Sequence, residues 1–197
     1  VSLLIGDRLS IDPQGVYFGT AEADDEMAVI NTRTVLNHRG IGVRKVRLYT
    51  EIKDMDGHTV ASDSIPVTVM EHDSIELTQK LYVRRPKLWS AEQPSLYQYH
   101  MEIRENEEII DTGEGTFGIR TVQVDPIRGL RVNGNMVKLR GGCIHHDNGI
   151  IGSAEFLHAE QVRIRELKKA GYNAIRSAHY PMSRQLLEVC DQIGMYV

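Results

Sequence analysis

The feature that most constrains the fold is a two-residue alternation of apolar and polar side chains. Between about residue 28 and about residue 120, segments such as 45–52, 75–83 and 97–104 repeat this pattern. Successive side chains of a β-strand point to opposite faces of a sheet, so the alternation predicts half-buried strands. The repeated face of these segments consists of Val46, Leu48, Thr50, Ile52, Ile75, Leu77, Leu81, Val83, Tyr97, Tyr99, Met101 and Ile103.

Turn-forming sequences separate these predicted strands. They are "NHRG" at 37–40, "DMDGH" at 54–58, "EHDS" at 71–74 and "ENEE" at 105–108. Several short strands with such punctuation, over about 100 residues, predict an antiparallel β-sandwich of immunoglobulin-like type. Both cysteines of the chain lie outside this stretch. The sandwich therefore has no inter-sheet disulfide and depends on its apolar core.

The pattern changes after residue 120. "GLRVNGNMVKLRG" places two alternating runs around Asn133-Gly134, a dipeptide that accepts positive φ at both central positions of a type I′ hairpin turn. Next come a helix over "AEQVRIRELKKAG", a strand over "NAIR", a helix over "SRQLLEVCDQIG" with Ser183 as its cap, and a strand from Met195. Alternating strands and helices predict the start of a parallel α/β fold, which places its chemistry in the loops after the strands.

The composition excludes several classes of partner. The 197 residues are 41% hydrophobic and carry a formal net charge of −4, as in an ordinary soluble protein. No long cluster of Lys and Arg would bind nucleic acid or an anionic membrane, and no apolar run reaches the roughly 20 residues of a membrane span. The chain starts without a Met or a signal-peptide pattern. We therefore expect an excised segment of a cytoplasmic or periplasmic protein, with any signal peptide outside it.

Polar side chains capable of chemistry gather after two of the predicted strands. They are His145, His146, Asp147 and Asn148 after the first strand, and Arg176, His179 and Tyr180 at the end of the second. A zinc site formed by Cys143 with the first group is disfavoured, because zinc ligands are usually spaced to converge whereas adjacent histidines diverge. The sequence thus predicts no metal and no cofactor here.

Five motifs resemble glycoside hydrolase family 2, the β-galactosidase and β-glucuronidase family. They are "PKLWSAEQPSLY", "FGIRTVQV", "LRVNGNMVKLRGGCIHHD", "NAIRSAHYP" and "CDQIGMYV", in this order. The resemblance implies an immunoglobulin-like sandwich over residues 1–121, followed over 122–197 by the βαβαβ start of a (β/α)8 TIM barrel. It also implies a jelly-roll domain upstream and the remaining barrel strands downstream.

The resemblance also implies roles for individual residues. His145 and His179 are similar to the histidines that hydrogen-bond the hydroxyls of the sugar, and Arg176 to the arginine that orients the nucleophilic carboxylate. Well-known members read R-H-E-H-H-P where this chain reads "CIHHDNG". His146, Asp147, Asn148 and Tyr180 are therefore secondary candidates for substrate binding.

The two catalytic glutamates of the family lie on later barrel strands, so the resemblance places no catalytic acid or nucleophile in this chain. Asn106-Glu107 falls in a predicted turn of the sandwich and only superficially resembles the family's Asn-Glu pair. The glutamates on or beside the predicted helices are interpreted as solvated surface. These are Glu155, Glu160, Glu166 and Glu188.

The predicted function is that of a fragment of a retaining exo-β-glycosidase that hydrolyses terminal β-galactosides. The alternatives are a β-glucuronidase of the same family and a non-catalytic carbohydrate-binding sandwich module. The isolated chain is expected to be inactive, because hydrolysis needs both carboxylates. We also expect it to self-associate or to have a poorly ordered tail, because a barrel that stops after three strands leaves an open edge.

Three further residue types have a structural interpretation beside a functional one. Trp89 could stack on a sugar, but its place in the sandwich motif favours packing in a core or at a domain interface. Arg176 could pair with a buried carboxylate instead of serving the site. Cys143 and Cys190 are predicted to be small buried residues.

Overall fold

The computed structural model describes residues 5–197 and contains two compact units. The first unit contains the chain up to Pro86 together with Tyr97–Ile119, and the second contains Lys87–Leu96 and Arg120–Val197. Residues 1–4 of the predicted sandwich lie outside the described residues.

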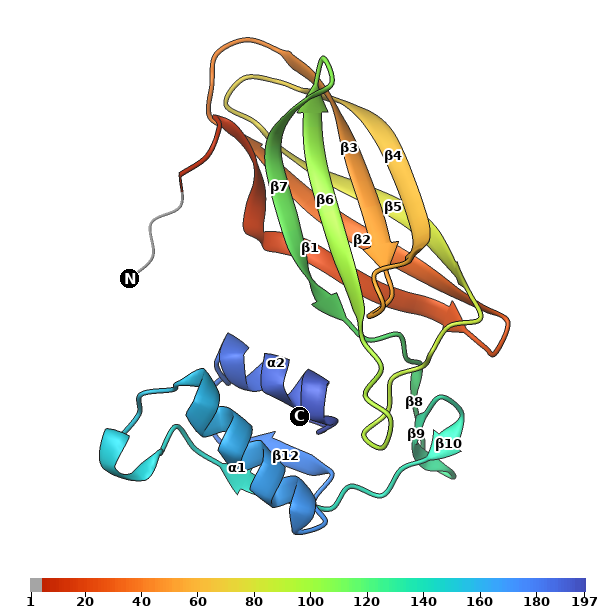
Figure 1. Cartoon of the computed structure of the whole chain (residues 1–197), viewed down its shortest axis with the longest axis vertical. Helices are drawn as coiled ribbons and strands as arrows, with labels where there is room; N and C mark the ends of the chain where they lie inside the picture. The colour runs from red at the N-terminus through yellow and green to blue at the C-terminus, as the bar shows by residue number, and fades with distance from the viewer. Residues whose placement is uncertain (1–4) are drawn as a thin grey trace. The chain divides into compact units, whose positions relative to one another are not determined.

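The first unit is a sandwich of two antiparallel sheets (Figure 1). One sheet has the order β1-β2-β5 and the other β4-β3-β6-β7, a seven-stranded arrangement that confirms the immunoglobulin-like prediction. The strands are β1 (Leu9–Ala23), β2 (Met27–His38), β3 (Arg44–Lys53), β4 (Thr59–Val69), β5 (Ser74–Arg84), β6 (Tyr97–Glu105) and β7 (Glu108–Phe117).

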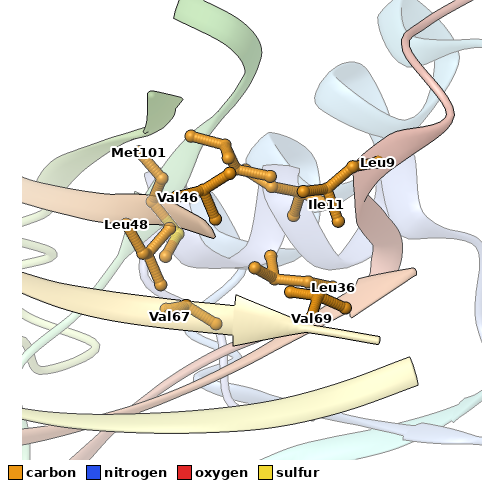
Figure 2. Close-up of a cluster of buried hydrophobic side chains, with 9 residues drawn as sticks. Leu9, Ile11, Leu36, Val46, Leu48, Val67, Val69 and Met101 are labelled. Carbon is orange, nitrogen blue, oxygen red and sulfur yellow. The ribbon is translucent and has the colours of Figure 1, made fainter. Parts of the chain in front are cut away.

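The core of the sandwich is formed by alternate residues from both sheets. Figure 2 shows part of it, where Leu9 and Leu36 from one sheet face Val67 and Met101 from the other. The predicted face of β3 is buried at all four of its positions. Pro66 lies in β4, an edge strand, where the missing N–H of proline costs no central ladder bond.

Strand β1 was not predicted, although it is the longest strand described. Its burial does not alternate regularly, and its pairing with β2 shifts register between Ile11 and Val16 and again between Thr20 and Glu22. The first irregularity adds three residues to β1 and the second adds one, and each odd number reverses which side chains face the core. The two-residue periodicity is consequently lost from the sequence of this edge strand.

The second unit begins with a small antiparallel sheet of β8 (Val122–Asp125), β9 (Gly129–Val132) and β10 (Asn135–Met136). The β9–β10 turn consists of Asn133 and Gly134, with φ values of 51° and 77°. The predicted type I′ hairpin is confirmed.

A parallel pair, β11 (Gly141–Ile144) and β12 (Ala174–Ser177), follows (Figure 1). Along the chain, helix α1 (Leu157–Lys169) connects the two strands and helix α2 (Arg184–Ile193) follows β12. Tyr196 forms a parallel bridge to Ala174, where the third strand was expected. Residues from both helices and β12, together with Met195 beyond α2, form one apolar cluster of Ile164, Ile175, Leu186, Val189, Cys190 and Met195. No helix within residues 5–197 is long and apolar enough to cross a membrane.

The limits of α2 follow the predicted signals. The hydroxyl of Ser183 accepts a hydrogen bond from the Leu186 N–H at 3.1 Å, and Gly194 ends the helix with a φ of 84°. A side-chain cap and a left-handed terminal glycine each satisfy backbone groups that a helix end leaves unpaired.

Segment 87–96 belongs to the second unit. The indole of Trp89, only 1% exposed, donates to the Asp191 carbonyl at 2.8 Å and meets the Tyr196 ring edge-on at 5.5 Å. The Lys168 ammonium donates to the carbonyls of Ala91 and Gly194. Burial lowers the pKa of Lys168. Trp89 is thus a core residue, as the sequence favoured.

Candidate functional site

The parallel pairing of β11 and β12 brings the two polar loops together. Gly141 of β11 faces Ala174 of β12, and a Cβ on Gly141 would lie 2.3 Å from the Ala174 carbonyl oxygen, so only glycine fits this approach. At the other end of the pair, the Ala178 N–H donates to the Ile144 carbonyl at 3.0 Å. The residues that follow each strand are consequently neighbours.

Asn173 fixes the start of the same strand pair. Its side chain is buried, accepts from the Arg140 N–H at 2.7 Å and donates to the Lys138 carbonyl at 3.0 Å. These bonds satisfy backbone groups where β11 begins, and they hold the two strands in register. Sequence reasoning placed Asn173 in a motif but gave it no role.

His145 and His179 lie beside each other at the ends of β11 and β12. Their ring centroids are 5.7 Å apart, and both residues are exposed. His179 has a φ of 70°, in the left-handed region that a non-glycine residue rarely adopts. Such strain persists only where the surrounding structure holds the residue, and it is concentrated at functional sites.

Arg176 and Cys143 form a second contact across the strand pair. The guanidinium of Arg176 donates from Nη1 to the Cys143 Sγ at 3.6 Å, and both residues are exposed. The prediction that both cysteines are buried is therefore wrong for Cys143 and confirmed for Cys190. Cys143 lies in β11, and no part of the chain within residues 5–197 covers it.

The loop after β11 forms one side of the site. His146 Nε2 lies 3.2 Å from Glu155 Oε1, at ion-pair distance but outside the angles of a hydrogen bond. The His146 ring stacks on Tyr180 with centroids 6.1 Å apart, and Tyr180 meets the His179 ring edge-on at 6.5 Å. Together with His145 beside His179, four of the candidate residues thus form one continuous cluster of rings.

Asp147 and Asn148 serve the loop itself in this structure. The Asp147 carboxylate accepts from the Gly149 N–H at 3.3 Å. The amide of Asn148 donates to the Ala154 carbonyl at 3.0 Å and to Glu160 Oε1 at 2.9 Å, and its oxygen accepts from Arg163. The polar groups of Asn148 are thus engaged with the protein.

The interpretation of Glu160 as solvated surface is wrong, because this residue is completely buried. It lies four residues before the buried Ile164 of α1, on the same helix face. That spacing was the signal in the sequence that could have revealed it. Glu166 and Glu188 do lie on the surface, in exposed ion pairs with Lys169 and Arg184.

Potential metal ligands converge elsewhere. Within residues 5–197, three side chains able to share an ion within 4.8 Å of one another are Asp54, Asp56 and His58, in the turn between β3 and β4. Asp54 already accepts hydrogen bonds from the backbone N–H groups of the other two, at 3.0 and 2.9 Å. These bonds account for the clustering.

Comparison with known proteins accounts for both units. Residues 14–120 match "Glycosyl hydrolases family 2", and residues 122–197 match "Glycosyl hydrolases family 2, TIM barrel domain". The chain belongs to glycosyl hydrolase family 2. It is 33% identical over 93% of its length to the β-galactosidase BoGH2A of Bacteroides ovatus, and 27% identical over 99% to a β-glucuronidase of Bacteroides fragilis.

Solved structures of family 2 members share the fold. A member from Bacteroides cellulosilyticus superposes with a TM-score of 0.93 at 37% identity over 96% of the chain. A Bacteroides uniformis β-glucuronidase gives 0.88 at 25% identity over the same share. The chain spans 22% and 29% of the two curated relatives, and 26% and 24% of these two structures.

Proposed function

We propose that this chain is part of a retaining exo-β-glycosidase that hydrolyses terminal β-galactosides, and that it supplies the sandwich and part of the sugar-binding rim. The observation that carries the proposal is the pair of imidazoles, His145 and His179, at the ends of adjacent parallel strands with rings 5.7 Å apart. TIM-barrel enzymes build their active sites at this end of the strands. The similarity to BoGH2A supports galactoside as the substrate.

His145 and His179 would contact the hydroxyls of the sugar in the cleavage subsite. The transition state of glycoside hydrolysis resembles an oxocarbenium ion, and hydrogen bonds to ring hydroxyls strengthen as it forms. Arg176, exposed beside them at the end of β12, would orient the nucleophilic carboxylate. The two carboxylates would come from parts of the protein outside these 197 residues, so the chain alone should not hydrolyse glycosides.

The second candidate is a β-glucuronidase. It is supported by the relative from Bacteroides fragilis, which matches 99% of the chain, and by the Bacteroides uniformis structure. The imidazole pair would serve either sugar, because both present ring hydroxyls. The residues that distinguish a neutral C6 alcohol from a carboxylate would decide between the two.

The test uses the full-length protein with chromogenic β-galactoside and β-glucuronide substrates. We expect preferential hydrolysis of the galactoside, and about a 100-fold or greater loss of kcat/KM in His145→Ala and His179→Ala, because contacts that strengthen in the transition state are removed. His158→Ala, an exposed histidine on α1, is the matched control and should keep full activity. Inactivity of the wild-type protein on every β-glycoside, or equal activity of all three variants, would overturn the proposal.

A carbohydrate-binding module remains the alternative from another class. Titrating the isolated chain with galactose and lactose separates the two, because an incomplete subsite should bind only very weakly. Micromolar affinity would favour the module. We also propose the division into a sandwich over residues 1–121 and a barrel start over 122–197, which the ranges of the two family matches support.

A further inference from the structure

The loop that carries His145 and His146 is attached to helix α1 by one arginine. Arg163 donates from Nη1 to the His145 carbonyl at 3.3 Å and from Nη2 to the Asp147 carbonyl at 2.6 Å. The same guanidinium donates to the Asn148 side-chain oxygen. One planar group thus binds the loop at three points, on both sides of His146.

Glu160 holds this arginine and the loop from inside the unit. Its carboxylate is completely buried, with Oε1 accepting from Asn148 Nδ2 at 2.9 Å and Oε2 lying 3.6 Å from Arg163 Nη1. Oε2 has no hydrogen-bond partner. A buried charge of this kind costs free energy, and an ion pair of this length only partly offsets the cost. Greater helix stability is therefore a poor explanation for a carboxylate here.

The opposite side of the loop faces the site. His146 stacks on Tyr180, and the His145 ring lies beside that of His179. The backbone between these rings and α1 carries two glycines with positive φ, Gly149 and Gly152, and has little regular structure beyond the three-residue 3-10 turn Gly149–Ile151. The bonds from Arg163 and Asn148 connect this irregular segment to helix α1.

We propose that Arg163 and Glu160 are positioning residues, which fix the backbone of residues 145–148 and thereby aim the His145 imidazole at the substrate. Asn148 belongs to this network and acts as a link between the two, with its amide directed into the protein. The inference rests on the proposed function, since the imidazole is what the network positions. A displacement of about 1 Å in such a group can cost about 100-fold in rate.

The kinetic test uses the full-length protein with Arg163→Met, and with Arg165→Met as control. Arg165 lies on the same helix and is exposed. We expect Arg163→Met to lower kcat/KM for the chromogenic galactoside about 10- to 100-fold, and Arg165→Met to leave it unchanged. If Arg163 acts through His145, its effect should disappear in a His145→Ala background, because contacts in one network are not additive. Full additivity in this double-mutant cycle would overturn the proposal.

Glu160→Gln provides a second variant of nearly the same shape. It should reproduce the kinetic loss of Arg163→Met while changing the melting temperature less, because the glutamine removes the charge opposite Arg163 without leaving a cavity. Wild-type kcat/KM in both Arg163→Met and Glu160→Gln would refute the positioning role.

Amide hydrogen exchange on the same proteins separates this inference from the proposed function. Arg163→Met should accelerate exchange in residues 145–154 while leaving β12 and α2 protected, whether or not the protein hydrolyses any glycoside. Unchanged exchange in that loop would overturn the inference even in an active galactosidase. Inactivity of the wild-type protein together with the local change would instead overturn the proposed function and retain the role of Arg163 in fixing the loop.

Discussion

Asn133, the first residue of the β9–β10 turn, has two functions that substitution can separate. Its side chain accepts from the Thr121 N–H and donates to the Trp89 carbonyl, both at 3.0 Å. Its backbone has a φ of 51°, which asparagine tolerates better than most residues. Asn133→Gly removes the two side-chain bonds and keeps the backbone unstrained. Asn133→Ala removes the same bonds and adds strain.

The expected magnitudes follow from these contacts. Each hydrogen bond contributes about 1 kcal/mol net, so Asn133→Gly should lower the free energy of unfolding of the second unit by about 2 kcal/mol. Compared with glycine at this position, an alanine at positive φ costs about 1–2 kcal/mol, and its smaller unfolded-state entropy returns about 0.4–1 kcal/mol. The net difference between the two variants is about 1 kcal/mol. Asn133→Ala should therefore lower the free energy of unfolding by about 3 kcal/mol. Asn135→Ala, an exposed neighbour in β10, should change it by less than about 0.5 kcal/mol.

Urea denaturation followed by tryptophan fluorescence measures these values directly. Trp89 is the single tryptophan of the chain and lies in the second unit, so its emission reports the unfolding of that unit. Equal destabilisation by the Gly and Ala variants would show that the strain at this turn is no larger than the entropy difference of about 0.4–1 kcal/mol, which would contradict the expected cost of about 1–2 kcal/mol. Wild-type stability in both would show that the two side-chain bonds contribute nothing.

Three other measurements test the electrostatics and the assembly of the chain. Burial raises the pKa of the Cys190 thiol to about 12, so only the exposed Cys143 should react quickly with a thiol reagent at pH 8, and Cys143→Ser should abolish that reaction. Burial would raise the pKa of Glu102, but hydrogen bonds from His100 and Arg104 outweigh it and the pKa lies below its usual 4.5. The folded state then binds fewer protons than the unfolded state at Glu102. The stabilisation from these hydrogen bonds is therefore present above about pH 4.5 and is lost at lower pH, and Glu102→Gln should flatten the acid denaturation profile. Light scattering should detect self-association of the isolated chain, and a monomer whose second unit resists hydrogen exchange as strongly as the sandwich would contradict it.

The sequence predicted best where local chemistry and burial agree. The alternation in β3 identified its buried face because that strand is central and regular. Asn133-Gly134 identified its turn because few dipeptides accept positive φ twice. Ser183 and Gly194 identified both ends of α2 for similar steric reasons.

Long-range bonds were harder to predict. Glu160, Arg163 and Asn148 are separated by up to fifteen residues. The spacing of Glu160 to Ile164 indicates the buried face of the helix, but nothing in the local sequence shows that Glu160 and Arg163 bind the preceding loop. The exposure of Cys143 likewise depends on which side of β11 is covered, which no local pattern records. The family motifs and the predicted strand order placed His145 and His179 after two successive strands, while the contact between their rings came from the structure.

The interleaved connectivity of the two units determines where the gene could be divided. The polypeptide leaves the first unit after Pro86, contributes ten residues to the second, and returns at Tyr97. A cut at residue 121 would therefore separate Trp89 from the Asp191 carbonyl and Lys168 from the Ala91 carbonyl. Either half expressed alone would expose groups that are buried in the second unit, such as the indole of Trp89. Recombination that exchanges barrels between relatives should accordingly succeed more often when segment 87–96 is exchanged with the barrel than when it stays with the sandwich.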